Sequence, residues 1–200
     1  MININSLYQS LTKLYYLFQI PLFNKFALPP LQAFFDVTYR CNLRCNICHS
    51  LSLIRGSQTF DSKRKELTSG QINKIIHQLP RNTLITFTGG EPFLREDMID
   101  ILSESCKSYK CHIITNGTLI NQKTANSMVE LRTRSLMTPG LMMVGFSIEG
   151  PEKIHDEIVA KKGSFQKAIT AITLLQSQKK ELHSPYPMIH LTTVITSRNA

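Results

Sequence analysis

Three of the five cysteines in this 200-residue chain lie within eight residues, in the spacing C-x3-C-x2-C. They are Cys41, Cys45 and Cys48, and the residues between them include two asparagines and an arginine. Inert structural thiols usually lie among apolar side chains, so this polar loop argues against a purely structural role. Three thiolates on one short loop can bind three irons of a [4Fe–4S] cluster and leave the fourth iron open to a ligand. The spacing therefore predicts an iron–sulfur centre.

Two other metal chemistries match part of the loop. Cys45, Cys48 and His49 form the pattern C-x-x-C-H of covalent haem attachment. That chemistry requires export, and the first residues show no basic stretch, apolar stretch and cleavage site of a secretion signal. A zinc site would need a fourth nearby ligand, which His49 could supply, but the second ligand pair usual in zinc modules is missing. Cys106 and Cys111 are expected to be core thiols, because cysteine is often fully buried.

The composition restricts the partners and the location of the protein. The 23 Lys and Arg against 14 Asp and Glu give a formal charge of +9, which favours acidic partners such as nucleotides, anionic lipid or an acidic redox protein. The basic residues are scattered without interleaved aromatic residues, so no nucleic-acid groove is indicated. No apolar run reaches the roughly 18 to 20 residues of a membrane span. Clustered cysteines without a secretion signal favour a cytoplasmic location.

The chain alternates between strand and helix patterns after the Pro29–Pro30 break. Strands are predicted at 34–38, 83–88, 111–115, 141–149 and 188–196. Four helices are predicted between the strands. The first is opened by a capping box at Thr68 and Gln71, and the last by a cap at Ser164. The residues that share one face of each helix are Ile72, Ile75, Ile76 and Leu79; Met98, Ile101, Leu102 and Ser105; Ala125, Met128, Val129 and Arg132; and Phe165, Ala168, Ile169, Ile172 and Leu175. This alternation predicts an α/β fold with parallel strands.

Two further segments are assigned more simply. Residues 6–20 carry apolar side chains at helical spacing, which predicts an amphipathic helix that packs on the domain or contacts a membrane surface. Residues 51–65 form a polar connection.

Each remaining motif follows a predicted strand, where parallel α/β folds place their sites. Gly89, Gly90 and Glu91 follow the second strand; glycines allow backbone carbonyls to approach a ligand, and carbonyls with a carboxylate suit an ammonium group. Asn116 follows the third strand. On the fourth strand Ser147 and Glu149 share one face with Gly145 and are expected to point inward.

The cysteine spacing, Gly89–Pro92, Thr115–Gly117 and Ser147–Pro151 together resemble the radical S-adenosylmethionine (radical SAM) superfamily, from about Phe34 to the last residue. The resemblance implies a partial (β/α)6 barrel, here truncated after the fifth strand, with residues 1–30 as an N-terminal helix and linker and 31–200 as the core domain. It also implies a [4Fe–4S] cluster that cleaves S-adenosylmethionine (SAM) to a 5′-deoxyadenosyl radical, which abstracts a substrate hydrogen.

The resemblance assigns roles to the motifs. Gly89, Gly90 and Glu91 are expected to bind the SAM amino group, and Ser147 and Glu149 its ribose or methionine part. Asn116 is expected to shape the cavity. Two positions depart from the family pattern, because Ile47 replaces an aromatic residue and Val159 stands where relatives usually have an arginine.

The resemblance is strongest to the subgroup that modifies peptides and proteins or builds cofactors. Its substrate would be a peptide or a small molecule, and its electron donor a flavodoxin- or ferredoxin-like protein. The alternative is a non-catalytic iron–sulfur electron-transfer or partner-binding module.

Overall fold

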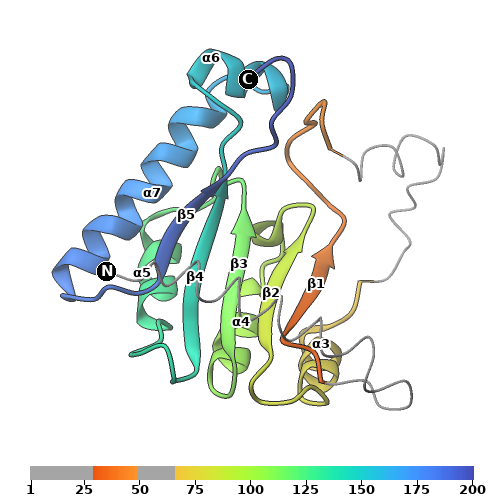
Figure 1. The fold of residues 1–200 in the computed structure, drawn as a ribbon, viewed down its shortest axis with the longest axis vertical. Helices are drawn as coiled ribbons and strands as arrows, with labels where there is room; N and C mark the ends of the chain where they lie inside the picture. The colour runs from red at the N-terminus through yellow and green to blue at the C-terminus, as the bar shows by residue number, and fades with distance from the viewer. Residues whose placement is uncertain (1–28, 49–65) are drawn as a thin grey trace, which may run out of the picture. The chain divides into compact units, whose positions relative to one another are not determined.

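The fold is an open parallel sheet backed by helices, as shown by a computed structural model that describes residues 29–48 and 66–200. The strands are β1 (Gln32–Thr38), β2 (Leu84–Gly89), β3 (Lys110–Thr115), β4 (Gly140–Ser147) and β5 (Met188–Thr192). They pair in the order β1-β2-β3-β4-β5, and every neighbouring pair is parallel. All five arrowheads in Figure 1 therefore point the same way. The predicted α/β class is confirmed.

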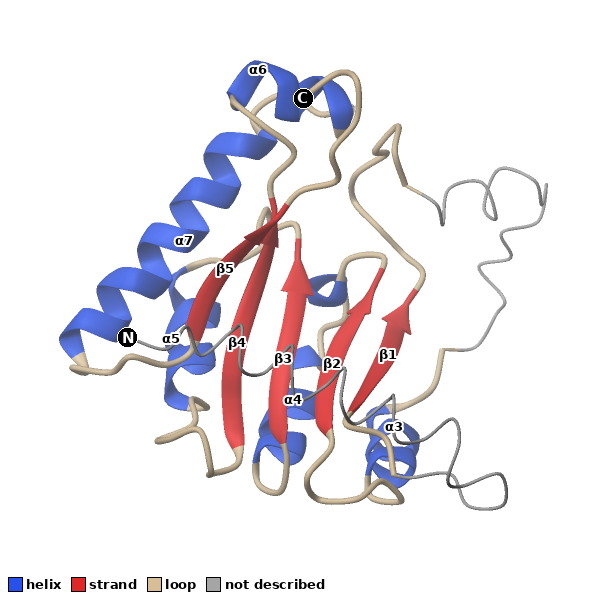
Figure 2. Ribbon diagram, viewed as in Figure 1, coloured by secondary structure: helices blue, strands red, loops and turns tan. Residues whose placement is uncertain are grey.

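Helices connect successive strands. They are α3 (Ser69–Ile76), the 3-10 helix η1 (Pro92–Leu94), α4 (Met98–Cys106), α5 (Gln122–Glu130), α6 (Glu152–Ile158) and α7 (Ser164–Glu181). Figure 2 shows α3, α4 and α5 behind the sheet, and α6 beyond the carboxyl ends of β4 and β5. Apolar residues from α3, α4, α5 and α7 join those of the strands in one buried core, and Cys106 and Cys111 belong to it as predicted.

The first helix shows where apolar spacing succeeds and where it fails. The capping box at Thr68 and Gln71 is present, and Ile72 and Ile76 are buried. The prediction that Ile75 shares their buried face is wrong, because this side chain is exposed. The helix α3 has only eight residues, and the side that packs against the core carries Ile72 and Ile76. Ile75 lies outside this side.

Two predicted strands are too long. The fourth ends at Ser147 rather than at residue 149, because the backbone N–H of Glu149 donates to the Nδ1 of His155 instead of continuing the ladder. The fifth ends at Thr192 rather than at residue 196. Beyond it the Val194 N–H donates to the Glu149 carboxylate, and a turn begins where Thr196 accepts from the chain that follows.

The prediction that Ser164 caps the long helix is also wrong. Ser164 is the first residue of α7, and its buried hydroxyl has no hydrogen-bond partner within residues 29–48 and 66–200. The Asp156 carboxylate performs this function from a distance, accepting from the backbone N–H groups of Gly163 and Phe165. Gly163 lies in the left-handed region, at φ 78°, which turns the chain so that both amides face Asp156.

Several predictions fall outside the described residues, including the helix at 6–20, the connection at 51–65 and His49. Residues Leu31–Ala200 form one compact unit. The division at residue 30 into a linker and a core domain stays a prediction. Among the helices described, none combines the length and the apolar character needed to cross a membrane.

Candidate functional site

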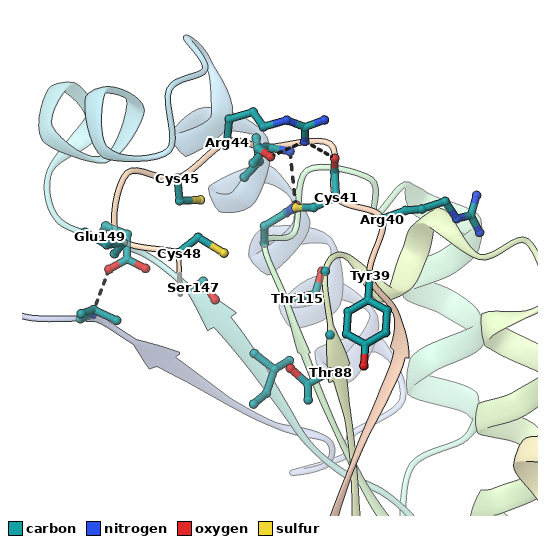
Figure 3. Close-up of a pocket in the computed structure, with 17 residues that line it drawn as sticks. Tyr39, Arg40, Cys41, Arg44, Cys45, Cys48, Thr88, Thr115, Ser147 and Glu149 are labelled. Carbon is teal, nitrogen blue, oxygen red and sulfur yellow. Dashed lines mark hydrogen bonds between the residues drawn. The ribbon is translucent and has the colours of Figure 1, made fainter. Parts of the chain in front are cut away.

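The cysteine loop, residues 39–48, follows β1 and runs above the carboxyl ends of the strands (Figure 1). Cys41 and Cys45 are partly buried and Cys48 is exposed. The Cys48 N–H donates to the carbonyl of Cys45 at 3.1 Å and closes a turn between them. In Figure 3 the three sulfur atoms point into a common space. The structure thus brings the three predicted ligands together.

Gly89 and Gly90 hold the cysteine loop against β2. The Gly90 N–H donates to the Thr38 carbonyl at 2.7 Å, and the Glu91 N–H donates to the Arg40 carbonyl at 2.8 Å. A Cβ atom at either glycine would lie closer than 3.0 Å to one of these carbonyl oxygens, and Gly89 also has φ 124°. The glycines are therefore required by the close approach of the loop backbone, a contact that the sequence did not reveal.

The Glu91 carboxylate joins the ends of β2 and β3. It is fully buried and accepts from the Thr115 hydroxyl at 2.8 Å, the Asn116 N–H at 2.8 Å and the Phe93 N–H at 3.1 Å. Burial raises the pKa of Glu91, although these donors act in the opposite direction. The Glu91 side chain does not line the cavity, and its contact with a SAM amino group stays a prediction.

Asn116 connects the end of β3 to the cysteine loop. Its Nδ2 donates to the Oδ1 of Asn42 at 2.9 Å, and its own Oδ1 accepts from the Thr118 N–H at 2.9 Å. Asn42 in turn donates to the Thr118 hydroxyl at 2.8 Å. Asn116 lies on the cavity wall, as expected for a residue that shapes the cavity, and it also orients the loop.

Ser147 and Glu149 lie at the end of β4, on the opposite side of the cavity from the β1 and β2 ends (Figure 3). The Glu149 carboxylate accepts from the Val194 N–H at 2.9 Å, and Val194 itself lines the cavity. Ser147 forms part of the same wall. Both polar residues thus face the cavity, Ser147 as the last residue of β4 and Glu149 from the turn that follows it.

A cavity of about 380 Å³ lies at the centre of these elements. This volume is within the range of roughly 300 to 1,000 Å³ that is usual for small-molecule sites. The wall contains eight of the nine predicted site residues, namely Cys41, Cys45, Cys48, Gly89, Gly90, Asn116, Ser147 and Glu149. Ile47, which stands in place of the family's aromatic residue, also lines it.

Sequence reasoning missed several residues of the site. Tyr39, Arg40, Arg44 and Thr88 also line the cavity. Arg44 donates from one guanidinium nitrogen to the carbonyls of Cys41 and Leu43, at 2.6 and 2.8 Å. These four residues could have been predicted to line the site, because each lies next to a ligand cysteine or at the end of a strand.

A network of charged residues fixes the start of the loop. Arg40 pairs with Glu66 through two hydrogen bonds of 3.0 Å. The buried Arg95 lies 3.6 Å from the same carboxylate, pairs with Asp97 and donates to the Val37 carbonyl. Nothing in the spacing of these residues indicates that they meet.

The surroundings of Cys41 and Cys45 disfavour the thiolate form. Burial raises the pKa of Cys45 to about 12, and the neighbouring thiols add to this effect. Burial likewise raises the pKa of Cys41. Metal ions reverse this preference, because a coordinating thiol loses its proton. The donor set thus suits a cationic group.

Three thiols face the same cavity. Cys41, Cys45 and Cys48 line its wall, and their sulfur atoms point into a common space (Figure 3). Three thiolates can bind three irons of a [4Fe–4S] cluster and leave the fourth iron open to a ligand. These three residues are therefore the ones that would hold such a cluster.

The fold and the site together define an α/β protein with three cysteines in the wall of one cavity at the carboxyl ends of its parallel strands. The sequence profile of the Radical SAM superfamily matches residues 35–193. The chain belongs to this superfamily. Enzymes of the superfamily use a [4Fe–4S] cluster and SAM.

Curated relatives include proteins of peptide and cofactor chemistry. The chain is 30% identical over 156 residues to the antilisterial bacteriocin subtilosin biosynthesis protein AlbA of Bacillus subtilis, covering 76% of the chain and 32% of AlbA. It is 29% identical over 145 residues to an AdoMet-dependent heme synthase of Oleidesulfovibrio alaskensis, covering 70% and 34%. It is 28% identical over 172 residues to a cysteine-type anaerobic sulfatase-maturating enzyme of Clostridium novyi, covering 80% and 42%. The chain thus spans about a third of the first two and less than half of the third.

Solved structures share the fold. Native anSMEcpe with bound AdoMet and a Cp18Cys peptide aligns with a TM-score of 0.58 at 21% identity, covering 84% of this chain and 44% of that one. Streptococcus suis SuiB bound to S-adenosylmethionine aligns with a TM-score of 0.60 at 18% identity, covering 84% and 35%.

Proposed function

We propose that this chain is the cluster- and SAM-binding part of a radical SAM enzyme. The observation that carries the proposal is that one cavity is lined both by three converging thiols and by the ends of β2, β3 and β4. Cys41, Cys45 and Cys48 would hold the cluster. When bound, the cluster and SAM supply one-electron cleavage of SAM and abstraction of a substrate hydrogen.

The residues of the chain would bind and orient these groups. The backbone at Gly89 and Gly90 faces the cavity with the polar side chains of Asn116, Ser147 and Glu149, which suits the amino acid and ribose parts of SAM. Ile47 would cover an apolar face of the ligand. Glu91 would act indirectly, by keeping the ends of β2 and β3 in register through its three hydrogen bonds.

A peptide or protein is the proposed substrate class. Support comes from the relatives, because AlbA is named for bacteriocin biosynthesis, the Clostridium novyi relative is named for sulfatase maturation, and anSMEcpe was solved with a peptide. Cofactor biosynthesis is the second class, supported by the heme synthase relative.

The proposed electron donor is an acidic flavodoxin- or ferredoxin-like protein in the cytoplasm. Arg44 is exposed on the cysteine loop next to Cys45, and Cys48 on the same loop is also exposed. Positive charge at this position would attract an acidic donor to the side of the loop where the metal centre lies.

The test is release of 5′-deoxyadenosine. The full-length protein is reconstituted anaerobically with iron and sulfide, reduced with dithionite and given SAM. We expect release that is abolished in Cys45→Ala and retained in Cys106→Ala, whose thiol is buried in the core. A reconstituted cluster without any release would contradict the proposal and favour the non-catalytic iron–sulfur module.

A further inference from the structure

The short helix α6 accepts hydrogen bonds from the cysteine loop. The last four carbonyls of an α-helix have no partner within the helix and must be satisfied from elsewhere. Here the carbonyls at the end of α6 face the loop. Three donor–acceptor pairs join the two segments: Asn46 N–H to Ile158 O at 2.8 Å, Arg44 N–H to Val159 O at 3.3 Å, and Asn46 Nδ2 to Glu157 O at 3.4 Å.

These contacts fix the backbone on both sides of Cys45. Arg44 and Asn46 flank this cysteine, and both of their N–H groups donate to α6. Lys161, just after the helix, adds a bond from its Nζ to the Asn42 carbonyl at 3.2 Å. The contacting segments are more than 100 residues apart in sequence. The loop backbone that carries Cys45 is therefore held directly against the end of α6.

The same helix is joined to the opposite wall of the cavity. The Nδ1 of His155 accepts from the Glu149 N–H at 3.1 Å, directly after the end of β4. His155 is only 1% exposed, and its ring also packs edge-on against Phe165. Asp156 binds the first turn of α7, as described above. One turn of α6 thus contacts the end of β4, and the next contacts the cysteine loop.

We propose that α6 is a bridge that sets the position of Cys45 relative to the end of β4, with His155 and Asn46 as positioning residues. The proposal rests on the proposed function, in which Cys45 binds the cluster and the end of β4 binds SAM. It also gives Val159 a role, because its carbonyl, rather than a side chain, serves the site.

Hydrogen exchange of the full chain without iron tests the bridge without any cofactor. His155→Leu removes the acceptor of the Glu149 N–H, and we expect exchange of segment 43–47 to become about tenfold faster, as for the loss of one hydrogen bond. His155→Asn, which can place an amide oxygen near the Nδ1 position, should restore slow exchange. His77→Leu is the matched control, since the Nδ1 of His77 bonds the Asn73 carbonyl of its own helix and the side chain lies exposed at the end of α3.

Faster exchange near Glu149 with no change at 43–47 would overturn the bridge. Because this result requires no cluster, it is distinguishable from failure of the proposed function. If His155→Leu does not fold, Asn46→Ala tests the other end of the bridge. It removes one exposed side chain, and unchanged exchange at 43–47 in that variant would also overturn the proposal.

The loaded protein provides a second readout. At equal iron content, His155→Leu should weaken SAM binding about tenfold, measured as the SAM-dependent change in the EPR signal of the reduced cluster, and His155→Asn should recover most of it. Equal SAM affinity in the wild-type and His155→Leu proteins would contradict a bridge between the two walls.

Discussion

The five cysteines divide into two groups with different surroundings. Cys41, Cys45 and Cys48 face the cavity, whereas Cys106 and Cys111 lie in the core. The spacing of the cysteines predicted this division, because the three that could bind one cluster lie within eight residues of one another and the other two lie far from them in the sequence. The same signal does not exist for residues brought together by folding.

Single Cys→Ala variants test the division. We expect Cys41→Ala, Cys45→Ala and Cys48→Ala to lose most of the iron after anaerobic reconstitution, since the loop carries no spare thiol. Cys106→Ala and Cys111→Ala serve as controls and should retain iron, with a modest loss of stability from the core. Iron and sulfide analysis is the measurement. Equal losses in all five variants would contradict the assignment.

Glu91 is predicted to act through structure. Both carboxylate oxygens of Glu91 accept hydrogen bonds, and Glu91→Gln replaces one of them with an amide nitrogen that cannot accept. At least one buried donor would then lose its partner. We expect a loss of about 1 to 3 kcal/mol in the free energy of unfolding, measured by urea denaturation of the chain without iron. Glu96→Gln is the control, because Glu96 is exposed on the same connection. Unchanged stability with weakened SAM binding would instead place the carboxylate in contact with the ligand.

His112 gives the stability a predictable dependence on pH. Burial, with the nearby His190 adding to it, lowers the pKa of His112 to about 4. The two rings lie 5.0 Å apart, and the Thr86 hydroxyl lies 3.3 Å from the Nδ1 of His112. Between about pH 6.5 and pH 4 the unfolded chain therefore binds a proton that the folded chain excludes, and stability falls as the pH falls.

The test compares urea denaturation at pH 7 and pH 5. His112→Gln should show a smaller loss of unfolding free energy over this interval than the wild-type chain, and the full effect is at most about 3 kcal/mol. His77→Gln, at an exposed position, should keep the wild-type dependence. Identical pH dependence in His112→Gln and wild type would show that the ring is protonated without cost.

At the scale of elements, the sequence predicted the strands and helices better than their ends. The order of the elements follows from apolar periodicity, and every predicted strand is present. The ends of β4 and β5 depend on two hydrogen bonds of Glu149, whose N–H donates to His155 and whose carboxylate accepts from the Val194 N–H. Such bonds leave no periodic trace in the sequence. The same holds for Asp156, whose contribution to α7 depends on the turn at Gly163.

The cap of α7 is tested by a pair of variants. Asp156→Ala should destabilise the chain by about 0.5 to 2 kcal/mol, as for the loss of an N-cap. Ser164→Ala should be nearly neutral, because it removes a buried hydroxyl that has no partner. Thermal or urea denaturation distinguishes them. A larger loss of unfolding free energy in Ser164→Ala than in Asp156→Ala would show that Ser164 caps the helix.

At the scale of the whole molecule, the parallel order of the strands creates the site. Because all five strands run in the same direction, motifs separated by more than 100 residues meet at one edge of the sheet. The sequence predicted this meeting from topology alone. It could not predict which hydrogen bonds join the motifs to one another, because the partners of Glu91, Asn116 and α6 lie on segments that are distant in the sequence.

The open edge at β5 leads to the last prediction. In the described part of the chain β5 is an outer strand, so one side of its backbone has no neighbouring strand there. Leu191 on β5 is 58% exposed, and Ile195 just beyond it is 79% exposed. Such an edge is a template for pairing with another chain. We expect the 200-residue chain to self-associate as its concentration rises, in size-exclusion chromatography with light scattering. Leu191→Lys should reduce this association, whereas Met137→Lys, at an 85% exposed loop position away from the edge, should not. A chain that stays monomeric, with slow hydrogen exchange over residues 188–192, would show that the edge is stable without a further strand.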